Sequence, residues 1–195
     1  MANDPDGWDA EAPAFDAEPD HGLSDPQVRA AWWRLLSGVL PAPPARVADL
    51  GSGTGTLSVL LAERGHAVDG VDFSPQMVER ARAKADAAGV AARFTVGDAA
   101  DPDLDRAAYD VVLSRHVLWA MPDPAAAFAR WVGLLRTGGR VVLVEGNWST
   151  GAGLTATEAL RIVEATGLRG VVRPMPEPAY WGRQITDERY LLLAE

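Results

Sequence analysis

The sequence contains no cysteine, which excludes disulfide bonds, thiolate metal sites and cysteine nucleophiles. It also lacks long apolar runs. Stretches such as Val141–Val144 are about four residues long, whereas a membrane-spanning helix needs roughly 20, so we expect no membrane span. The first residues contain neither a basic region nor an apolar core. We therefore expect no secretory signal there and a cytoplasmic location.

Basic residues are missing from the first 25 positions, which hold eight acidic groups. The remaining 170 residues contain the other 19 acidic groups and all 18 basic ones, so the net charge of -9 lies mostly in this acidic leader. Because nucleic-acid binding needs clustered Lys and Arg, we expect no nucleic-acid partner. The acidic leader, residues 1–24, is either a solvated tail or, given its bulky rings, a segment that folds over something. A single domain is expected over residues 25–195.

From Ser24 onward the sequence alternates between helical and strand patterns. Ser24 can cap a first helix, which proline residues end at 41–44. Apolar spacing predicts helices at 57–64, 75–88, 124–135 and 156–165. Short apolar segments predict strands at 46–50, 66–71, 93–96, 109–113, 140–145, 168–173 and 189–194.

This alternation indicates an α/β protein with a mostly parallel sheet and helices on both sides. The last two strands are joined by a short loop broken by three prolines, which favours an antiparallel pair. In such sheets ligands lie beyond the carboxyl ends of the strands. The residues that close each strand are therefore the ones to examine.

The strongest motif follows the first predicted strand, in the segment 49–57, which reads DLGSGTGTL. Glycines at alternate positions allow a sharp turn from strand to helix and let a ligand approach the bare main chain. Asp72 closes the next strand, 17 residues after Gly55. A carboxylate at that place can accept hydrogen bonds from ribose hydroxyls. The two features together favour a nucleoside site over an ordinary glycine-rich connection.

The spacing differs from the dinucleotide fingerprint, because Thr56 occupies the place of its third glycine. The alternate-glycine form, preceded by Asp49, resembles motif I of the class I S-adenosylmethionine-dependent methyltransferases. Ser52 stands where many members have Cys, and Thr137 where Pro is more frequent. Three other segments agree with that family: Val96–Ala99, Tyr109–Ser114 and Leu134–Leu143. The resemblance covers about residues 45–146, and is to small-molecule enzymes that include those of ubiquinone and menaquinone biosynthesis.

The resemblance implies a three-layer Rossmann-like fold with a seven-stranded, mostly parallel sheet of order 3-2-1-4-5-7-6, its last strand antiparallel. It also implies transfer of a methyl group from S-adenosylmethionine to O, N or S of a small-molecule acceptor, leaving S-adenosylhomocysteine. We expect no metal in the site, and a monomer or homodimer.

Carried over residue by residue, the resemblance assigns the cofactor contacts. The glycines and Asp49 face the methionine part, Asp72 binds the ribose, and Ser114 and Arg115 close the pocket near the sulfonium. Phe73 packs on the adenine, as does Met77 unless it is a plain core residue. The full set expected to bind cofactor is Asp49, Gly51, Ser52, Gly53, Gly55, Asp72, Phe73, Met77, Gly97, Asp98, Ala99, Ser114 and Arg115.

The acceptor is expected at the rim of the same edge. His116 follows the fourth strand and is either a general base or hydrogen-bonding group for the acceptor, or a packing residue. His21 is a second catalytic candidate. Four more residues are expected in the substrate pocket: Phe15, Trp119, Trp148 and Glu145. Phe15 and the next residue match an aromatic-Asp pair that folds over the cofactor in similar enzymes. Glu145 is either a substrate contact or a carboxylate satisfied by a helix amino terminus.

Two other functions are weighed against methyl transfer. A nicotinamide-dependent oxidoreductase is disfavoured by the shifted glycine and by the absence of a Tyr-x-x-x-Lys pair, since Lys84 is the one lysine. A non-catalytic protein that binds S-adenosylmethionine and regulates or pairs with another subunit also fits the motifs. Calorimetric titration with both cofactors separates these alternatives.

Overall fold

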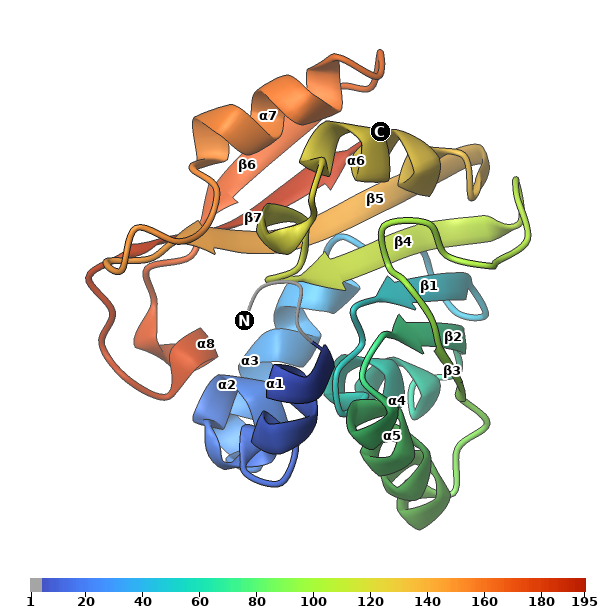
Figure 1. The fold of residues 1–195 in the computed structure, drawn as a ribbon, viewed down its shortest axis with the longest axis vertical. Coiled ribbons are helices and arrows are strands. Elements are labelled where there is room, and N and C mark those ends of the chain that lie inside the picture. The colour runs from blue at the N-terminus through green and yellow to red at the C-terminus, as the bar shows by residue number, and fades with distance from the viewer. Residues whose placement is uncertain (1–4) are drawn as a thin grey trace.

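The structure, a computed structural model, describes residues 5–195. Its strands form one seven-stranded sheet of order β3-β2-β1-β4-β5-β7-β6 (Figure 1). β1 to β5 pair in parallel, and β7 runs antiparallel to both β5 and β6. This confirms the predicted order and the antiparallel last strand. The strands are β1 Arg46–Leu50, β2 Ala67–Asp72, β3 Arg93–Val96, β4 Tyr109–Arg115, β5 Leu135–Asn147, β6 Gly170–Pro174 and β7 Glu188–Ala194.

The helices cover both faces of the sheet. On one face, Trp32 of α3 and Leu60 of α4 pack with Val47 and Val111 of the sheet. On the other face, α6 and α7 pack over the central strands. Within residues 5–195 the α-helices are α1 Pro5–Glu11, α2 Pro19–Gly22, α3 Pro26–Ser37, α4 Thr56–Ala62, α5 Pro75–Ala88, α6 Pro124–Val132, α7 Ala156–Glu164 and α8 Pro178–Trp181, with single 3-10 turns at η1 Phe15–Ala17 and η2 Leu118–Ala120.

Polar side chains begin several of these helices by accepting from free backbone N–H groups. The Ser74 hydroxyl accepts from the Met77 amide, and Thr155 forms a capping box with Glu158. For α3 the cap is Asp25, which accepts from Gln27, rather than the predicted Ser24. Either residue type suits the position, and the difference moves the start of α3 by one residue.

The end of α6 and the start of β5 also differ from the prediction. α6 ends at Val132, and β5 already begins at Leu135 rather than Arg140. The pairing of β5 with β4 shifts register between Tyr109 and Val111, so the early part of β5 is irregular. Gly138, with φ of +77°, lies in that part. A helix ending three residues before an irregular strand leaves no clean apolar pattern from which to place the boundary.

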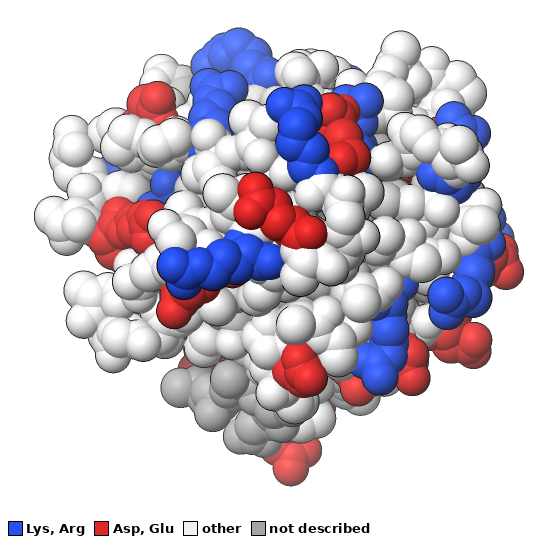
Figure 2. Space-filling view, turned by 90° about the horizontal axis from the view of Figure 1, so that it is seen from above, with Lys and Arg blue, Asp and Glu red and all other residues white. Residues whose placement is uncertain are grey.

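Within the acidic leader, residues 5–22 form α1, η1 and α2. Its helices, dark blue in Figure 1, lie beside the arrow tips of β1 and β4, which are the carboxyl ends of the central strands. Figure 2 shows basic and acidic side chains interspersed over the face that it presents. Within residues 5–195, no helix combines the length and apolar character needed to cross a membrane.

Candidate functional site

The glycine loop, residues 51–55, joins β1 to α4. Three of its glycines have positive φ: Gly51 (+69°), Gly53 (+54°) and Gly55 (+73°). A Cβ on Gly51 would lie 2.3 Å from a methyl carbon of Val117, so only glycine fits there. The amides of Gly51 and Ser52 donate to the carbonyl of Val71 at 2.8 and 3.0 Å. The loop is therefore fixed to the end of β2 and presents bare backbone to the space above the sheet.

Asp72 closes β2 and is bonded to the glycine loop. Its Oδ2 accepts from the Gly53 amide at 2.7 Å, and its Oδ1 accepts from the Ser74 amide at 3.0 Å. Burial raises the pKa of the Asp72 carboxyl, while these two bonds favour its charged form. Each carboxylate oxygen has further lone pairs, so Asp72 can still accept from a ligand hydroxyl.

Two other carboxylates occupy neighbouring strand ends. Asp49, in β1, is buried, and its Oδ2 accepts from the Ser58 hydroxyl at 2.6 Å. Burial raises the pKa of Asp49 to about 6. Asp98, just after β3, accepts from the Ala100 amide at 2.8 Å, which orders the turn. Together with Asp72 they place three acidic groups around one cavity.

The acidic leader is bonded to the rim of this cavity at two places. Asp9 accepts from the Ser74 hydroxyl and, at 3.1 Å, from the Gln76 amide at the start of α5. Asp16 accepts from Thr54 of the glycine loop at 2.6 Å and from the Lys84 ammonium at 3.0 Å. These contacts close the leader over the glycine loop.

Aromatic rings complete the cover. Phe15 stacks on His21 with ring centroids 4.2 Å apart, and Trp8 meets Phe15 edge to face at 6.2 Å. A ring carbon of Phe15 lies 3.4 Å from the position that a Cβ on Gly53 would take. Phe15 of the leader therefore lies against the glycine loop at this place.

A further group of lining residues, here called the acceptor end of the cavity, consists of His21, His116, Trp119 and Trp148. The His116 ring meets Trp148 edge to face at 5.1 Å, and Trp119 and Trp148 lie 5.4 Å apart. Burial and the positive charge of Arg115 lower the pKa of both histidines, that of His116 well below its ordinary value. Both imidazoles are therefore neutral near pH 7 and offer a lone pair.

The cavity has a volume of about 260 Å³ and brings together most of the residues predicted from the sequence. The predicted residues that line it are Phe15, His21, Asp49, Gly51, Ser52, Gly53, Asp72, Phe73, Met77, Asp98, Ala99, Arg115, His116, Trp119 and Trp148. The hydroxyl of Ser52 is buried without a hydrogen-bond partner among the described residues, which leaves it available to a ligand.

Four predicted residues do not line the cavity. Gly55 is the cap of α4, where a Cβ would lie 2.8 Å from Ala81 and Phe94, so its role is close packing. Gly97 donates its amide to the Asp72 carbonyl, and the hydroxyl of Ser114 donates to the Leu50 carbonyl at 2.9 Å. The Gly97 amide and the Ser114 hydroxyl therefore bond to backbone carbonyls at the ends of neighbouring strands and not to the cavity.

Glu145 is the fourth of these residues. It is fully buried, and its Oε1 accepts from the Val117 and Leu118 amides at 3.0 and 2.7 Å. Of the two alternatives stated for it, the structure shows the contact with a helix amino terminus, here η2, through Oε1, while Oε2 is buried without a hydrogen-bond partner among the described residues. Burial raises the pKa of Glu145 to about 8.

Sequence reasoning missed five lining residues: Trp8, Leu57, Val117, Ala120 and Met121. Trp8 carried a signal, since a bulky ring in an acidic stretch indicates folding. The other four are ordinary apolar residues in or beside predicted elements, and nothing in their local pattern separates a cavity wall from the core.

Comparison with known proteins agrees with this geometry. A family model described as a methyltransferase domain matches residues 48–143. The chain is 36% identical over 114 residues to the demethylmenaquinone methyltransferase of Thermus thermophilus, which covers 57% of the chain and 52% of that protein. It is 30% identical over 171 residues to the ubiquinone biosynthesis O-methyltransferase of Xanthomonas axonopodis pv. citri, covering 87% of the chain and 65% of that protein. The chain thus spans between about half and two thirds of the length of these curated relatives.

Solved structures share the fold. The magnesium protoporphyrin IX methyltransferase of Synechocystis PCC 6803, with S-adenosylmethionine bound, superposes with a TM-score of 0.68 at 24% identity. The superposition covers 86% of this chain and 77% of that one.

Proposed function

Because the chain belongs to the class I S-adenosylmethionine-dependent methyltransferases, we propose that it transfers the methyl group of this cofactor to an O, N or S atom of a small-molecule acceptor, leaving S-adenosylhomocysteine. The observation that carries the proposal is the joined unit of glycine loop and Asp72 carboxylate, which faces a cavity closed by the acidic leader. The acceptor itself is a separate question.

The residues at the strand ends fit the cofactor by their chemistry. We assign the bare backbone of residues 51–53, with Asp49, to the methionine part, and Asp72 to the ribose hydroxyls. Asp98 and Ala99, beyond β3, are assigned to the adenine. Phe73 and Met77 line the same part of the cavity and supply apolar contact for the base.

The bound cofactor supplies an electrophilic methyl group, so the chain has to position the acceptor and exclude water. Alignment of reactants is the main contribution that a protein makes to such a displacement. The leader closes one side through Phe15, and Trp119 and Trp148 form apolar walls at the acceptor end. His21 and His116 line the cavity beside these walls, and we assign them to the acceptor. This arrangement suits a small acceptor with an apolar or aromatic body and a polar group to be methylated.

The test is calorimetric titration with S-adenosylmethionine, S-adenosylhomocysteine and NAD, followed by methyl transfer to a panel of phenols, carboxylic acids, amines and thiols. We expect the first two to bind, NAD not to bind, and one acceptor class to gain a methyl group. NAD binding alone would favour an oxidoreductase. Cofactor binding without transfer to any acceptor would favour the non-catalytic alternative.

A variant of the acceptor end separates catalysis from cofactor binding. We expect His116→Ala to lower turnover by a factor of about 100, the usual contribution of a proton-handling group. The affinity for S-adenosylhomocysteine should change little, because His116 is assigned to the acceptor. Unchanged turnover in this variant would reduce His116 to a packing residue.

A further inference from the structure

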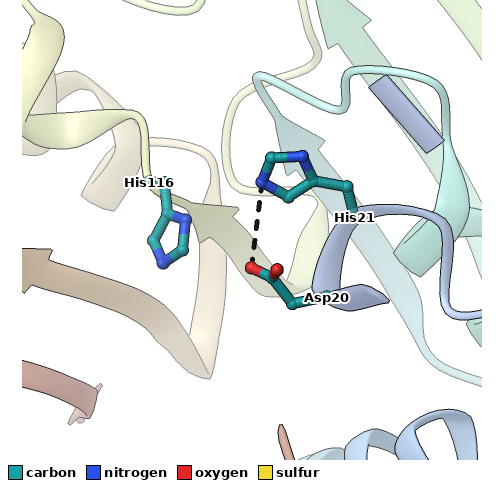
Figure 3. A group of neighbouring side chains, drawn as sticks. All are labelled: Asp20, His21 and His116. Atoms are coloured by element: carbon teal, nitrogen blue, oxygen red, sulfur yellow. Dashed lines mark ion pairs between the residues drawn. The ribbon is translucent and has the colours of Figure 1, made fainter. Parts of the chain in front are cut away.

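Two histidines and a carboxylate from distant parts of the chain meet at the acceptor end. Asp20 and His21 belong to α2 in the leader, whereas His116 directly follows β4. One ligand atom of each residue lies within 4.8 Å of the other two, and His21 Nε2 is 3.8 Å from Asp20 Oδ2. Figure 3 shows the His21 ring above the Asp20 carboxylate and the His116 ring to its left. His116 lies 95 positions after His21 in the sequence, so the leader and the end of a strand each supply part of the group.

The Asp20 side chain is only 7% exposed. Among the hydrogen bonds of residues 5–195, Asp20 accepts one from Arg115, and this bond goes to the backbone carbonyl rather than to the carboxylate. The Arg115 guanidinium interacts with the carboxylate electrostatically. The carboxylate oxygens accept no hydrogen bond among the described residues, so they keep lone pairs that can bind a metal ion.

Both imidazoles are held by contacts that leave nitrogen free. Phe15 stacks on His21, and Trp181 stacks on His116 with ring centroids 5.9 Å apart. His116 Nε2 is buried and has no hydrogen-bond partner among the described residues. His116 also has φ of +60°, a conformation that costs energy for a residue with a Cβ. Backbone strain of this kind is characteristic of functional sites.

We propose that Asp20, His21 and His116 bind one divalent first-row transition-metal ion. Two imidazoles and one carboxylate are suitable ligands for such an ion, and three protein ligands leave further coordination positions open. With bonds of about 2.1 Å the ligand atoms lie roughly 3 to 3.5 Å apart, so separations of up to 4.8 Å have to shorten by up to about 1.3 to 1.8 Å when the ion binds.

His21 and His116 line the cavity, whereas Asp20 does not, so an ion held by the three would lie at the cavity wall. Its remaining coordination positions would take an oxygen or nitrogen of the acceptor. This last role rests on the proposed methyl transfer, whereas metal binding itself does not. The arrangement also ties lid closure to the metal, since α2 supplies two ligands and the end of β4 supplies the third.

The alternative is a proton shared by His21 and Asp20 without any metal. The positive charge of Arg115 lies near both rings and opposes a shared proton and a metal ion alike, so charge does not separate the two alternatives. A proton joins two of the three groups, whereas a metal ion joins all three. The two alternatives therefore differ in whether His116 takes part.

The test uses tag-free protein stripped with a chelator and titrated with Co²⁺ in the absence of S-adenosylmethionine. We expect one equivalent to bind with a Kd of about 10 μM or below, with visible ligand-field absorption and displacement by Zn²⁺. Asp20→Asn and His116→Asn should each weaken binding at least about tenfold. The control is His66→Asn, since His66 is the third histidine of the chain and does not line the cavity.

Absence of stoichiometric Co²⁺ binding in the wild-type protein would overturn the proposal, whatever the folding of the variants. Equal loss in His66→Asn and His116→Asn would do the same. Titration with S-adenosylhomocysteine on the same samples keeps the two proposals separate. If Co²⁺ does not bind but S-adenosylhomocysteine does, the metal proposal fails and the proposed methyl transfer stands. If Co²⁺ binds but S-adenosylhomocysteine does not, the metal site stands without its role toward the acceptor.

Discussion

The Asp72 carboxylate accepts a hydrogen bond from the Gly53 amide, with 2.7 Å between oxygen and nitrogen. This bond joins the end of β2 to the glycine loop that follows β1. Two features that the sequence places 19 residues apart are therefore parts of one unit. Asp72 both shapes the loop and faces the cavity. Its removal should therefore weaken ligand binding directly, through a lost contact, and indirectly, through a less ordered loop.

Asp72→Asn should weaken binding of S-adenosylhomocysteine about tenfold to a hundredfold. The reason is the loss of a charged acceptor in a buried site, which costs roughly 1–3 kcal/mol. Asp69→Asn is the matched control, because Asp69 lies in the same strand but bonds to Arg93 and Tyr109 away from the cavity. That control should lower the unfolding temperature and leave affinity unchanged in calorimetric titration. Equal affinities for the wild type and Asp72→Asn would remove Asp72 from the site.

Gly51→Ala should destabilise the protein more than Gly89→Ala. Both glycines have positive φ, +69° and +66°, so the backbone strain of the two substitutions is alike. A Cβ on Gly51 would meet Val117 at 2.3 Å, whereas nothing lies within 4 Å of one on Gly89. We expect the difference in unfolding free energy to be about 1–3 kcal/mol, the usual cost of overpacking. Denaturant unfolding of the pair measures it, and similar values would mean that Val117 moves aside freely.

Lys84→Met should loosen the lid. Lys84 donates to Asp16 and to Thr56 at 2.6 Å, and is about a quarter exposed. A partly exposed ion pair of this kind contributes up to about 1 kcal/mol, which corresponds to roughly fivefold weaker cofactor binding. Amide hydrogen exchange over residues 15–22 should accelerate. Arg80→Met removes the same charge from an exposed position of α5 and should change neither measurement. Unaltered exchange in Lys84→Met would show that other contacts hold the leader closed.

Glu145 should make stability fall as the pH rises from about 5 to 8. Its ordinary pKa is 4.5, and burial raises it to about 8 in the folded protein. Between these values the folded state holds a proton that the unfolded state has lost, so raising the pH favours unfolding. The contribution is on the order of 3 kcal/mol across this window. Glu145→Gln should flatten the dependence of unfolding free energy on pH, and Glu177→Gln, at an exposed position, should not. Parallel curves for the wild type and Glu145→Gln would contradict the assignment.

Much of the sheet was predictable from the sequence because strands such as β1 and β2 are short apolar segments that end at, or are followed by, a polar or glycine residue. Asp49, Asp72 and Asp98 close or follow successive strands, and parallel strands bring such residues to one edge. The boundary between α6 and β5 was less predictable, since it depends on the register shift against β4. That shift depends on how the two strands pair, so the sequence of either strand alone does not reveal it.

The site divides in the same way. The glycine loop and Asp72 are local motifs, so their place at the cavity followed from sequence. The contacts of the acidic leader are long-range, such as Asp16 with Lys84 at a separation of 68 residues, and spacing does not reveal them. The sequence also left two roles open for Glu145. The choice depends on where η2 begins, because the amides of Val117 and Leu118 there donate to the Glu145 carboxyl group.

A crystal structure with S-adenosylhomocysteine bound tests the central claim most directly. The account predicts both ribose hydroxyls within hydrogen-bonding distance of Asp72, the homocysteine part against residues 51–53, and the sulfur directed toward His116. Electron density for the ligand at another place, or a ligand whose ribose lies away from Asp72, would contradict it.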